Sequence, residues 1–314
     1  MTHKLFSSLM IVLIITACAP ATPAPAPTTT PVPATSTATI IPTPTLGIGS
    51  TLISDKDGMT LLYVPAGEFT MGSDADDGLA ECQKIRRDCQ RRWFTNEEPS
   101  HSVHVDDFWI DQTEVTNLMY ALCVEAGVCQ EPTSTGSDTH SSYYGNAEFD
   151  NYPVIYVDWS MAKTYCEWAG RRLPTEAEWE KAARGENASV YPWGDTFDGS
   201  LVNFCDTNCP FDDGNKSFND GFADVAPVGS YPSGKSVYGA LDMAGNVWER
   251  VSSLYKPYPY DATDGRENLD SSDTRVLRGG AWDIYDGSVR SAIRGRFDPA
   301  VTDASVGFRC SRSP

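Results

Sequence analysis

The last forty residues, 275–314, constrain most what this chain can fold into. A glycine pair that bends the backbone is followed there by more charged and aromatic residues than a core strand holds. The segment begins with Arg278-Gly279-Gly280 and ends with Gly307-Phe308-Arg309-Cys310. Two successive glycines permit a bend that residues with side chains tolerate poorly. A solvated loop over a sheet and a binding surface built on loops both fit this composition. The candidate surface residues are Trp282, Asp283, Tyr285, Asp286, Arg290, Arg294 and Arg296.

The composition narrows the classes of partner. The chain has 314 residues with 43 acidic and 24 basic side chains, which gives a net charge of −19. This balance argues against nucleic acid and against an anionic membrane surface as partners. Plentiful glycine, proline and aromatic residues favour a loop-rich fold over a helical bundle.

Residues 1–18 are typical of an export signal. A lysine at position 4 precedes an apolar run from Leu5 to Ile15, which is too short for a comfortable membrane span. The run ends in Ile15-Thr16-Ala17-Cys18, which resembles the cleavage box of bacterial lipoproteins. We therefore predict lipidation at Cys18 and an extracytoplasmic protein held at a membrane by its lipid anchor alone. The alternative is an ordinary signal peptide with an incidental cysteine.

Residues 19–50 form a low-complexity segment rich in proline, threonine and alanine. Such a sequence favours extended polyproline conformations and has no core to bury, so we predict a disordered tether. The globular domain is predicted over residues 51–314.

Local signals within the domain predict several elements. Strand-like runs flank the Pro65-Ala66-Gly67 turn, another strand is expected over Val103–Ile110, and residues 74–96 are interpreted as a polar surface insertion. Thr116 is an N-cap candidate for a helix with Leu118, Leu122 and Cys123 on one face. A helix is expected over about Ser160–Ala169, and a third helix opens with a capping box at Thr175–Glu178 and ends at Gly185. Its glutamates, Glu176, Glu178 and Glu180, are interpreted as helix-end charges on solvated faces.

Four motifs together resemble the formylglycine-generating enzyme family, also called the sulfatase-modifying factor family. They are Val64-Pro-Ala-Gly-Glu-Phe-Thr-Met-Gly-Ser73, the run from Asp158 to Gly185, Arg278-Gly-Gly280 and Gly307-Phe-Arg-Cys310. The resemblance covers nearly all of Met59 to Cys310. It implies an α+β, irregular and loop-rich fold of the C-type-lectin-like kind, with few short helices around small antiparallel sheets.

The resemblance also implies what the oxidases of this family need. Their two copper-binding cysteines lie in the last stretch, whereas residues 281–309 of this chain contain no cysteine. Cu(I) prefers thiolate ligands, so the sequence argues against copper and offers no catalytic residue. Whether the chain is an enzyme of another kind stays open.

The nine cysteines fit an exported disulfide framework. Once Cys18 is assigned to lipid, eight remain, and six of them lie close in sequence as Cys82/Cys89, Cys123/Cys129 and Cys205/Cys209. The family resemblance implies that Cys166 pairs with Cys310. Zinc is the rival interpretation for Cys205 and Cys209, although no second ligand pair lies nearby.

The resemblance further implies two structural calcium sites. The first comprises Asn203, Phe204, Asp220 and Phe222, and the second comprises Asp242, Gly245, Val247 and Glu249. Carboxylate, amide and main-chain oxygens are the ligands that calcium prefers. The alternative is that these are turn residues satisfying local backbone groups.

Three functions remain open. The first, which we favour, is an anchored non-oxidase domain of the bacterial cell envelope that binds an unknown peptide, glycan or protein partner through the Trp282–Arg296 surface. The second is a formylglycine-generating oxidase that converts a substrate cysteine with copper and oxygen. The third is a structural envelope module, because fold resemblance alone does not fix function.

Overall fold

The computed structural model describes residues 19–26, 46–84, 86–212 and 214–314. The predicted signal segment, its Cys18 and much of the predicted tether lie outside the described residues. The chain divides into the units Met1–Pro44 and Thr45–Pro314. In the first unit, residues 19–26 are exposed and belong to no helix or strand. No helix among the described residues is long and apolar enough to cross a membrane.

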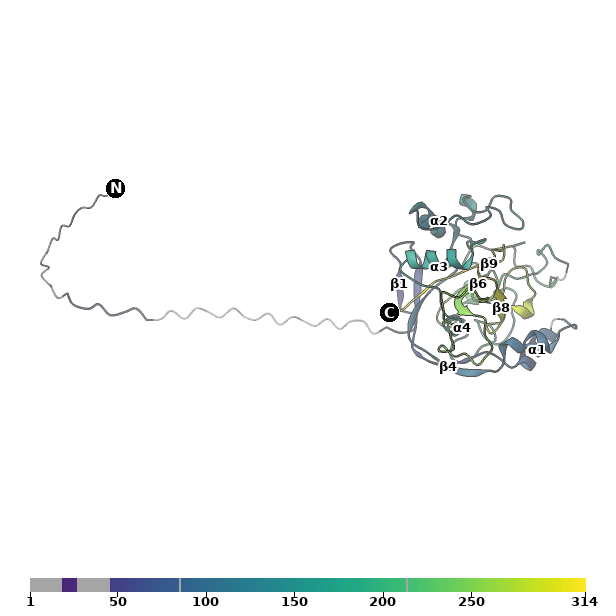
Figure 1. Ribbon diagram of the computed structural model, residues 1–314, viewed down its shortest axis with the longest axis horizontal. Coiled ribbons are helices and arrows are strands. Elements are labelled where there is room, and N and C mark those ends of the chain that lie inside the picture. The colour runs from purple at the N-terminus through teal and green to yellow at the C-terminus, as the bar shows by residue number, and fades with distance from the viewer. Residues whose placement is uncertain (1–18, 27–45, 85, 213) are drawn as a thin grey trace, which may run out of the picture. The chain divides into compact units, whose positions relative to one another are not determined.

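The second unit is built on three small sheets in its described part (Figure 1). The first has the antiparallel order β1 (Thr51–Ile53), β2 (Thr60–Val64), β5 (Phe108–Asp111) and β10 (Ser311–Arg312). The second is the antiparallel pair β3 (Gly67–Met71) and β4 (His101–Val105). The third has the order β8 (Arg294–Phe297), β7 (Arg275–Arg278), β6 (Trp248–Leu254) and β9 (Val306–Gly307), with only β6 and β9 parallel.

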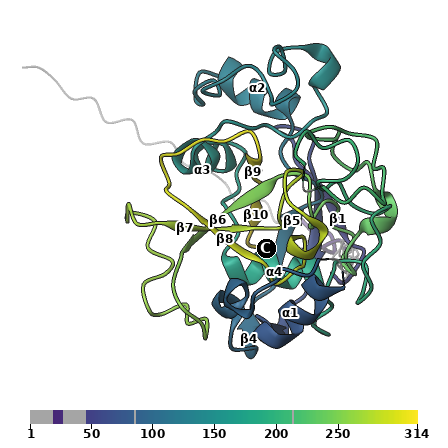
Figure 2. The same cartoon turned by 90° about the vertical axis from the view of Figure 1, so that its right-hand side faces the viewer.

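Short helices cover these sheets, and α2 lies at the opposite end of the unit from α1 and β4 (Figure 2). The α-helices are α1 (Ala75–Gln83), α2 (Asn117–Glu125), α3 (Trp159–Trp168) and α4 (Glu176–Arg184). The 3₁₀ turns are η1 (Arg91–Trp93), η2 (Thr95–Glu97), η3 (Ala147–Phe149), η4 (Pro232–Gly234) and η5 (Asp286–Ser288). The fold is therefore the irregular α+β arrangement expected from the sequence.

The local helix signals are confirmed. The Thr116 side chain accepts a hydrogen bond from the Met119 amide at the start of α2. At α4 both halves of the capping box form, because Thr175 accepts from the Glu178 amide and Glu178 accepts from the Thr175 amide. These caps satisfy amides that have no partner inside the helix, which fixes where each helix begins.

Two expectations about local structure, the strand over Val103–Ile110 and the buried face of the helix after Thr116, are wrong, and the 74–96 insertion gains a helix. The predicted strand over Val103–Ile110 is two strands in different sheets, since the chain leaves β4 at Asp106 and enters β5 at Phe108. The 74–96 insertion contains helix α1, which Asp74 caps. On α2 the buried residues are Asn117, Tyr120 and Cys123, whereas Leu118 is 52% exposed. The spacing of apolar residues therefore predicted the wrong buried face for this helix.

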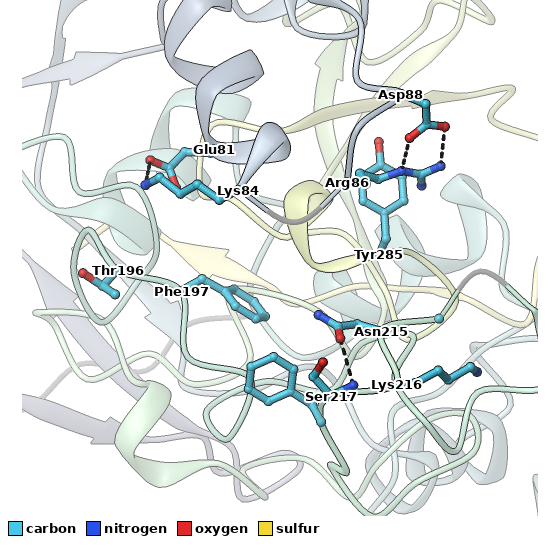
Figure 3. A pocket seen from close by; sticks show the side chains of 12 residues that line it. Glu81, Lys84, Arg86, Asp88, Thr196, Phe197, Asn215, Lys216, Ser217 and Tyr285 are labelled. Carbon is cyan, nitrogen blue, oxygen red and sulfur yellow. Dashed lines mark hydrogen bonds and ion pairs between the residues drawn. The ribbon is translucent and has the colours of Figure 1, made fainter.

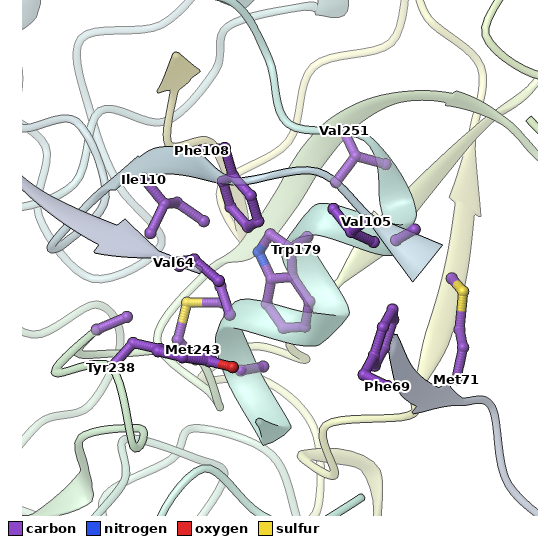
Figure 4. Packing of buried hydrophobic residues seen from close by; sticks show 14 of the residues in the cluster. Val64, Phe69, Met71, Val105, Phe108, Ile110, Trp179, Tyr238, Met243 and Val251 are labelled. Carbon is purple, nitrogen blue, oxygen red and sulfur yellow. The ribbon is translucent and has the colours of Figure 1, made fainter. Parts of the chain in front are cut away.

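The main hydrophobic core gathers residues of all three sheets around α4. Trp179 of α4 is fully buried among Val64 of β2, Phe69 of β3 and Val251 of β6 (Figure 4). The predicted break at Gly279-Gly280 serves this packing. Both glycines have positive φ, and a Cβ on Gly279 would lie 3.2 Å from the Trp179 ring.

Four disulfides brace the loops. They join Cys82 to Cys89, Cys123 to Cys129, Cys205 to Cys209 and Cys166 to Cys310. The pairing is the one expected from the sequence, and it removes the thiolates that zinc would need at Cys205 and Cys209.

A buried ion-pair network joins α4 to the third sheet. Glu176 receives Nε and Nη2 of Arg294 at 2.6 and 3.0 Å, and Glu180 receives Nη2 of Arg278 at 2.5 Å. Arg184 completes the network by donating to Glu180 at 2.9 Å. Glu176 and Glu180 are fully buried, so the expectation that they lie on solvated faces is wrong. The charged face of α4, which in a short helix usually lies in solvent, here faces the protein interior. Buried guanidinium groups compensate the charges of its carboxylates.

Replacement of Arg294 should test this network. Arg294→Met should lower the free energy of unfolding by about 3–5 kcal/mol, because Glu176 would keep a buried charge without its main partner. Denaturant unfolding followed by circular dichroism measures the change.

Arg296 of the same strand is exposed, so Arg296→Met is the matched control and should change stability by less than about 0.5 kcal/mol. The double variant Arg294→Met/Glu176→Gln should recover part of the loss, because the uncompensated charge is removed. Equal stability of the two single variants would contradict a role for the ion pair.

Candidate binding site

The predicted Trp282–Arg296 surface is largely internal. Trp282 is 2% exposed and belongs to a core cluster with Tyr143 and Phe149. Its ring stacks under Phe211, with ring centroids 5.9 Å apart. The prediction that Trp282 contributes free contact area is therefore wrong, because the chain covers the indole itself.

Two of the predicted arginines are committed to the fold. Arg290 donates to both oxygens of Glu97 at 2.9 and 2.7 Å, and both side chains are buried. Arg294 is held by Glu176 in the network described above. Neither guanidinium is available as a forked donor for a ligand, which corrects the prediction for both residues.

Three members of the predicted surface reach solvent. Tyr285 and Asp283 are half-buried, and Arg296 is exposed with its guanidinium 5.4 Å from the Tyr255 ring centroid. Burial raises the pKa of Asp283, with smaller contributions from Asp303 and Asp138. The Asp286 side chain lies outside the described side chains. These residues do not converge on one site, and Tyr285 is the one that lines a pocket.

The Tyr285 pocket has a volume of about 720 Å³ (Figure 3). Its walls come from the end of α1 and the turn after it, the 196–197 turn and the 214–218 loop. The lining residues are Glu81, Lys84, Arg86, Asp88, Thr196, Phe197, Gly214, Asn215, Lys216, Ser217, Phe218 and Tyr285. Gly287, two residues after Tyr285, approaches Cys82, since a Cβ on this glycine would lie 3.4 Å from the Cys82 Cα.

Charges of both signs line this pocket. Lys84 pairs with Glu81 at 2.5 Å, and Arg86 donates to both oxygens of Asp88 at 2.8 Å (Figure 3). The Arg86 guanidinium also lies 4.4 Å from the centroid of the Tyr285 ring. Lys216 Nζ donates only to the main-chain oxygens of Asp206 and Phe211 and has no carboxylate partner within the described residues. The pocket therefore combines aromatic walls with a mixed charged rim.

Sequence reasoning missed most of this pocket. Its wall residues lie in the 81–88, 196–197 and 214–218 segments, which carry no motif. One signal was present, because the short disulfides Cys82–Cys89 and Cys205–Cys209 brace two of the contributing loops. Loops braced in this way hold side chains in place where no helix or strand can do so.

The residues predicted for the first calcium site lie together. Both oxygens of Asp220 accept main-chain hydrogen bonds, from Phe204 at 3.1 Å and Phe222 at 2.9 Å. Asn203 is buried, and its Oδ1 has no hydrogen-bond partner in the described part of the protein. Burial raises the pKa of Asp220 to about 6, against the lowering effect of the two amides. A buried amide oxygen without a partner beside the Asp220 carboxylate fits the donor set of a calcium ion.

The second predicted site contains an excess of buried carboxylates. Glu249 accepts two hydrogen bonds from Arg309, at 2.6 and 2.7 Å, and a third from Trp179. Asp242 accepts from the Gly229 amide at 2.6 Å. Gly245 and Val247 lie between them in the turn before β6.

Glu114, which sequence reasoning did not assign to the site, adds a third carboxylate there. It is fully buried, and among the described residues its Oε2 has no hydrogen-bond partner. Burial and the Asp242 charge raise its pKa well above the usual value. If all three carboxylates near Arg309 were ionised, they would carry more negative charge than this guanidinium offsets, and a further cation would favour that state, so this donor set also fits calcium. Across the described residues no cluster of three or more His, Cys, Asp and Glu has the geometry of a metal site, so main-chain and amide oxygens would have to complete either set.

Comparison with known proteins identifies a family. The model of the sulfatase-modifying factor enzyme 1-like domain matches residues 53–314. The inactive C-alpha-formylglycine-generating enzyme 2 of Bos taurus is 32% identical over 315 aligned residues, which cover 85% of this chain and 90% of that protein. The formylglycine-generating enzyme of Streptomyces coelicolor is also 32% identical, over 79% of this chain and 87% of that protein.

Solved structures support the same fold. PvdO from Pseudomonas aeruginosa superposes with a TM-score of 0.62 at 24% identity, covering 86% of this chain and all of that one. At this identity the likeness concerns the fold alone. The described residues share an architecture with proteins that carry different names, and a shared fold does not by itself fix function.

Proposed function

The chain belongs to the sulfatase-modifying factor enzyme 1-like domain family, and from this premise we propose that it is a non-oxidase member that captures a peptide partner in the Tyr285 pocket. The alternatives are the formylglycine-generating oxidase and a purely structural envelope module. The observation that carries the proposal is that the pocket is open and chemically mixed while the described cysteines are all consumed in disulfides.

The cysteine pairing supports a non-oxidase. Each of the eight cysteines in the described residues is half of a disulfide, and none lies between Ala281 and Arg309. No acid, hydroxyl or imidazole replaces two thiolates as a ligand set for Cu(I). The similarity to a relative named as inactive agrees with this assignment.

The pocket lining supports a peptide as partner. Aromatic walls from Phe197, Phe218 and Tyr285 provide apolar contact area. Paired charges of both signs and Lys216 at the rim suit the mixture of side chains and main-chain groups that a peptide presents. A volume of about 720 Å³ accommodates a few residues of an extended chain.

Selection from a random peptide library displayed on phage tests this function. The wild-type protein should enrich peptides whose capture falls at least about tenfold in Tyr285→Ala, because an anchoring ring is removed. In a separate assay, the protein is incubated with a cysteine-containing sulfatase-type peptide, copper and oxygen. Mass spectrometry should find this peptide unconverted. Multiple turnovers to formylglycine would establish the oxidase instead.

Trp282→Ala is the matched aromatic control for Tyr285→Ala. It should lower the free energy of unfolding by about 3–5 kcal/mol, because a buried indole is lost from the core. Tyr285→Ala should change stability by less than about 1 kcal/mol. Equal peptide capture by wild type and Tyr285→Ala would refute the pocket and favour the structural module.

We further propose calcium at both predicted sites as structural ions. Asn203, Asp220 and the carbonyls of Phe204 and Phe222 would hold the first, and Asp242, Glu249 and the carbonyls of Gly245 and Val247 would hold the second. A bound divalent cation neutralises buried carboxylates and ties loops that few hydrogen bonds hold. Two buried oxygens, Asn203 Oδ1 and Glu114 Oε2, have no hydrogen-bond partner among the described residues, which supports this assignment.

Chelation tests the calcium proposal. Removal of calcium with EGTA should lower the Tm by roughly 5–10 °C relative to a solution whose calcium concentration is about a hundredfold above the Kd. The reason is that only the folded state binds the ion. Asp220→Asn and Asp242→Asn should each reduce this shift. Asp198→Asn, a change at an exposed aspartate outside both sites, should retain the whole shift. A Tm that changes neither with chelator nor with added calcium would disprove both calcium sites.

We also propose that Cys18 carries a lipid anchor that holds the protein outside the cytoplasm. Several acyl chains on one cysteine give stable membrane attachment. Cys18→Ser should shift the protein from the detergent phase to the aqueous phase in phase partitioning, or leave its signal segment uncleaved. Unchanged partitioning of a processed Cys18→Ser protein would exclude this anchor.

A further inference from the structure

A second hollow lies beside the turn that carries Trp193. It has a volume of about 520 Å³, and Trp193, Asn187, Ser189, Ser233, Lys235 and Val237 contribute to its lining. Ile48 also lines this hollow. Ile48 and Val237 are 61% and 60% exposed, the highest values among the large apolar side chains of the described residues. An exposed apolar rim around a hollow indicates a surface that is covered in use.

The Trp193 ring is held in place before any ligand arrives. It stacks on the buried Tyr191 ring with centroids 5.2 Å apart and planes 10° from parallel. Its Nε1 donates to the Thr196 carbonyl at 3.0 Å, which fixes the rotation of the indole. Binding on such a ring loses little side-chain entropy.

Four polar side chains of this hollow are uncommitted, whereas Arg184 and Ser236, which also line it, are hydrogen-bonded within the protein. Asn187, Ser189, Ser233 and Lys235 make no side-chain hydrogen bond or ion pair with any other residue in the described part of the chain. In the Tyr285 pocket, by contrast, Lys84 pairs with Glu81 and Arg86 with Asp88. Free hydroxyl, amide and ammonium groups beside a fixed aromatic ring can be satisfied by a ligand rich in hydroxyl groups.

We propose that the Trp193 hollow binds a neutral saccharide. The C–H face of a sugar ring packs on an aromatic ring, while its hydroxyl groups exchange hydrogen bonds with amides, hydroxyls and ammonium groups at the edge. A neutral sugar is favoured over an anionic one, because Glu186 offsets the charge of Lys235 in the lining and the chain carries a net charge of −19. Arg184, which also lines the hollow, is already paired with Glu180. The Trp193 hollow shares no lining residue with the Tyr285 pocket and does not depend on the function proposed for that pocket, although the neighbouring hollow described next shares Phe197 with it.

The hollow has room for more than one sugar unit. Trp193 also lines a neighbouring hollow of about 370 Å³, together with Asp195, Phe197 and Leu201. That second hollow offers a further aromatic ring, Phe197, next to carboxylate acceptors. A linear oligosaccharide can therefore follow the surface past Trp193, so a tetrasaccharide is a better probe than a single sugar.

Cellotetraose and chitotetraose are the probes for this site. The full-length protein should transfer NMR saturation to at least one of them at millimolar concentration, and calorimetry should give a Kd. Trp193→Ala should weaken binding by roughly tenfold, because the stacking platform is lost. Asn187→Ala should weaken it about two- to tenfold through one lost hydrogen bond, without changing the Tm.

Asn151→Ala is the matched control, because Asn151 is also exposed, makes no side-chain hydrogen bond in the described residues and lies outside these hollows. Asn151→Ala and Tyr285→Ala should both bind the tetrasaccharide as the wild type does.

If Trp193→Ala fails to fold, Asn187→Ala and Lys235→Ala still decide the question. Absence of binding by both tetrasaccharides, or wild-type affinity in Asn187→Ala and Lys235→Ala, would overturn the proposal. Peptide capture that is lost in Trp193→Ala but kept in Tyr285→Ala would assign the hollow to peptides instead.

Discussion

The buried pairing of α4 glutamates with arginines of the third sheet is the interaction on which this structure depends. Glu176 and Glu180 lie in the core, where an unpaired carboxylate would cost several kcal/mol, and Arg294 and Arg278 compensate them. The same helix carries Trp179 into the cluster that unites the three sheets. Electrostatic and apolar contacts therefore fix one position for α4, and that position requires both arginines to point inward.

This requirement changes the meaning of the last forty residues. A segment dense in arginine, tryptophan and aspartate has the composition of a binding surface, yet its Arg290 and Arg294 neutralise Glu97 and Glu176 and its Trp282 fills a core. In a loop-rich fold with few ladder hydrogen bonds, such side chains replace the backbone as the source of rigidity. Ligand-binding capacity is left to the loops around the core, where Tyr285 and Trp193 line open hollows.

The family relationship and the local chemistry answer different questions. Membership in the sulfatase-modifying factor enzyme 1-like domain family accounts for the scaffold, and the Cys166–Cys310 disulfide is the one that the motif resemblance implied. It does not by itself transfer an activity, because proteins of one fold carry different functions and residues 281–309 of this chain contain no cysteine. Much of the lining of the two hollows comes from loops between the family motifs, so their partners have to be argued from their own lining.

Features that depend on neighbours along the chain could be predicted from the sequence. The caps at Thr116 and Thr175, the Gly279-Gly280 bend and the short disulfides each involve groups a few residues apart, whose geometry the local spacing fixes. The resemblance in motifs added the fold and the long disulfide. Only the tertiary structure decided which charges are internal. Arg290 meets Glu97 across 193 residues, and Glu114 meets Asn246 across 132, so no periodicity records either contact. Burial is a property of the packed chain, and a charge is a ligand for a partner only where packing has not already given it one.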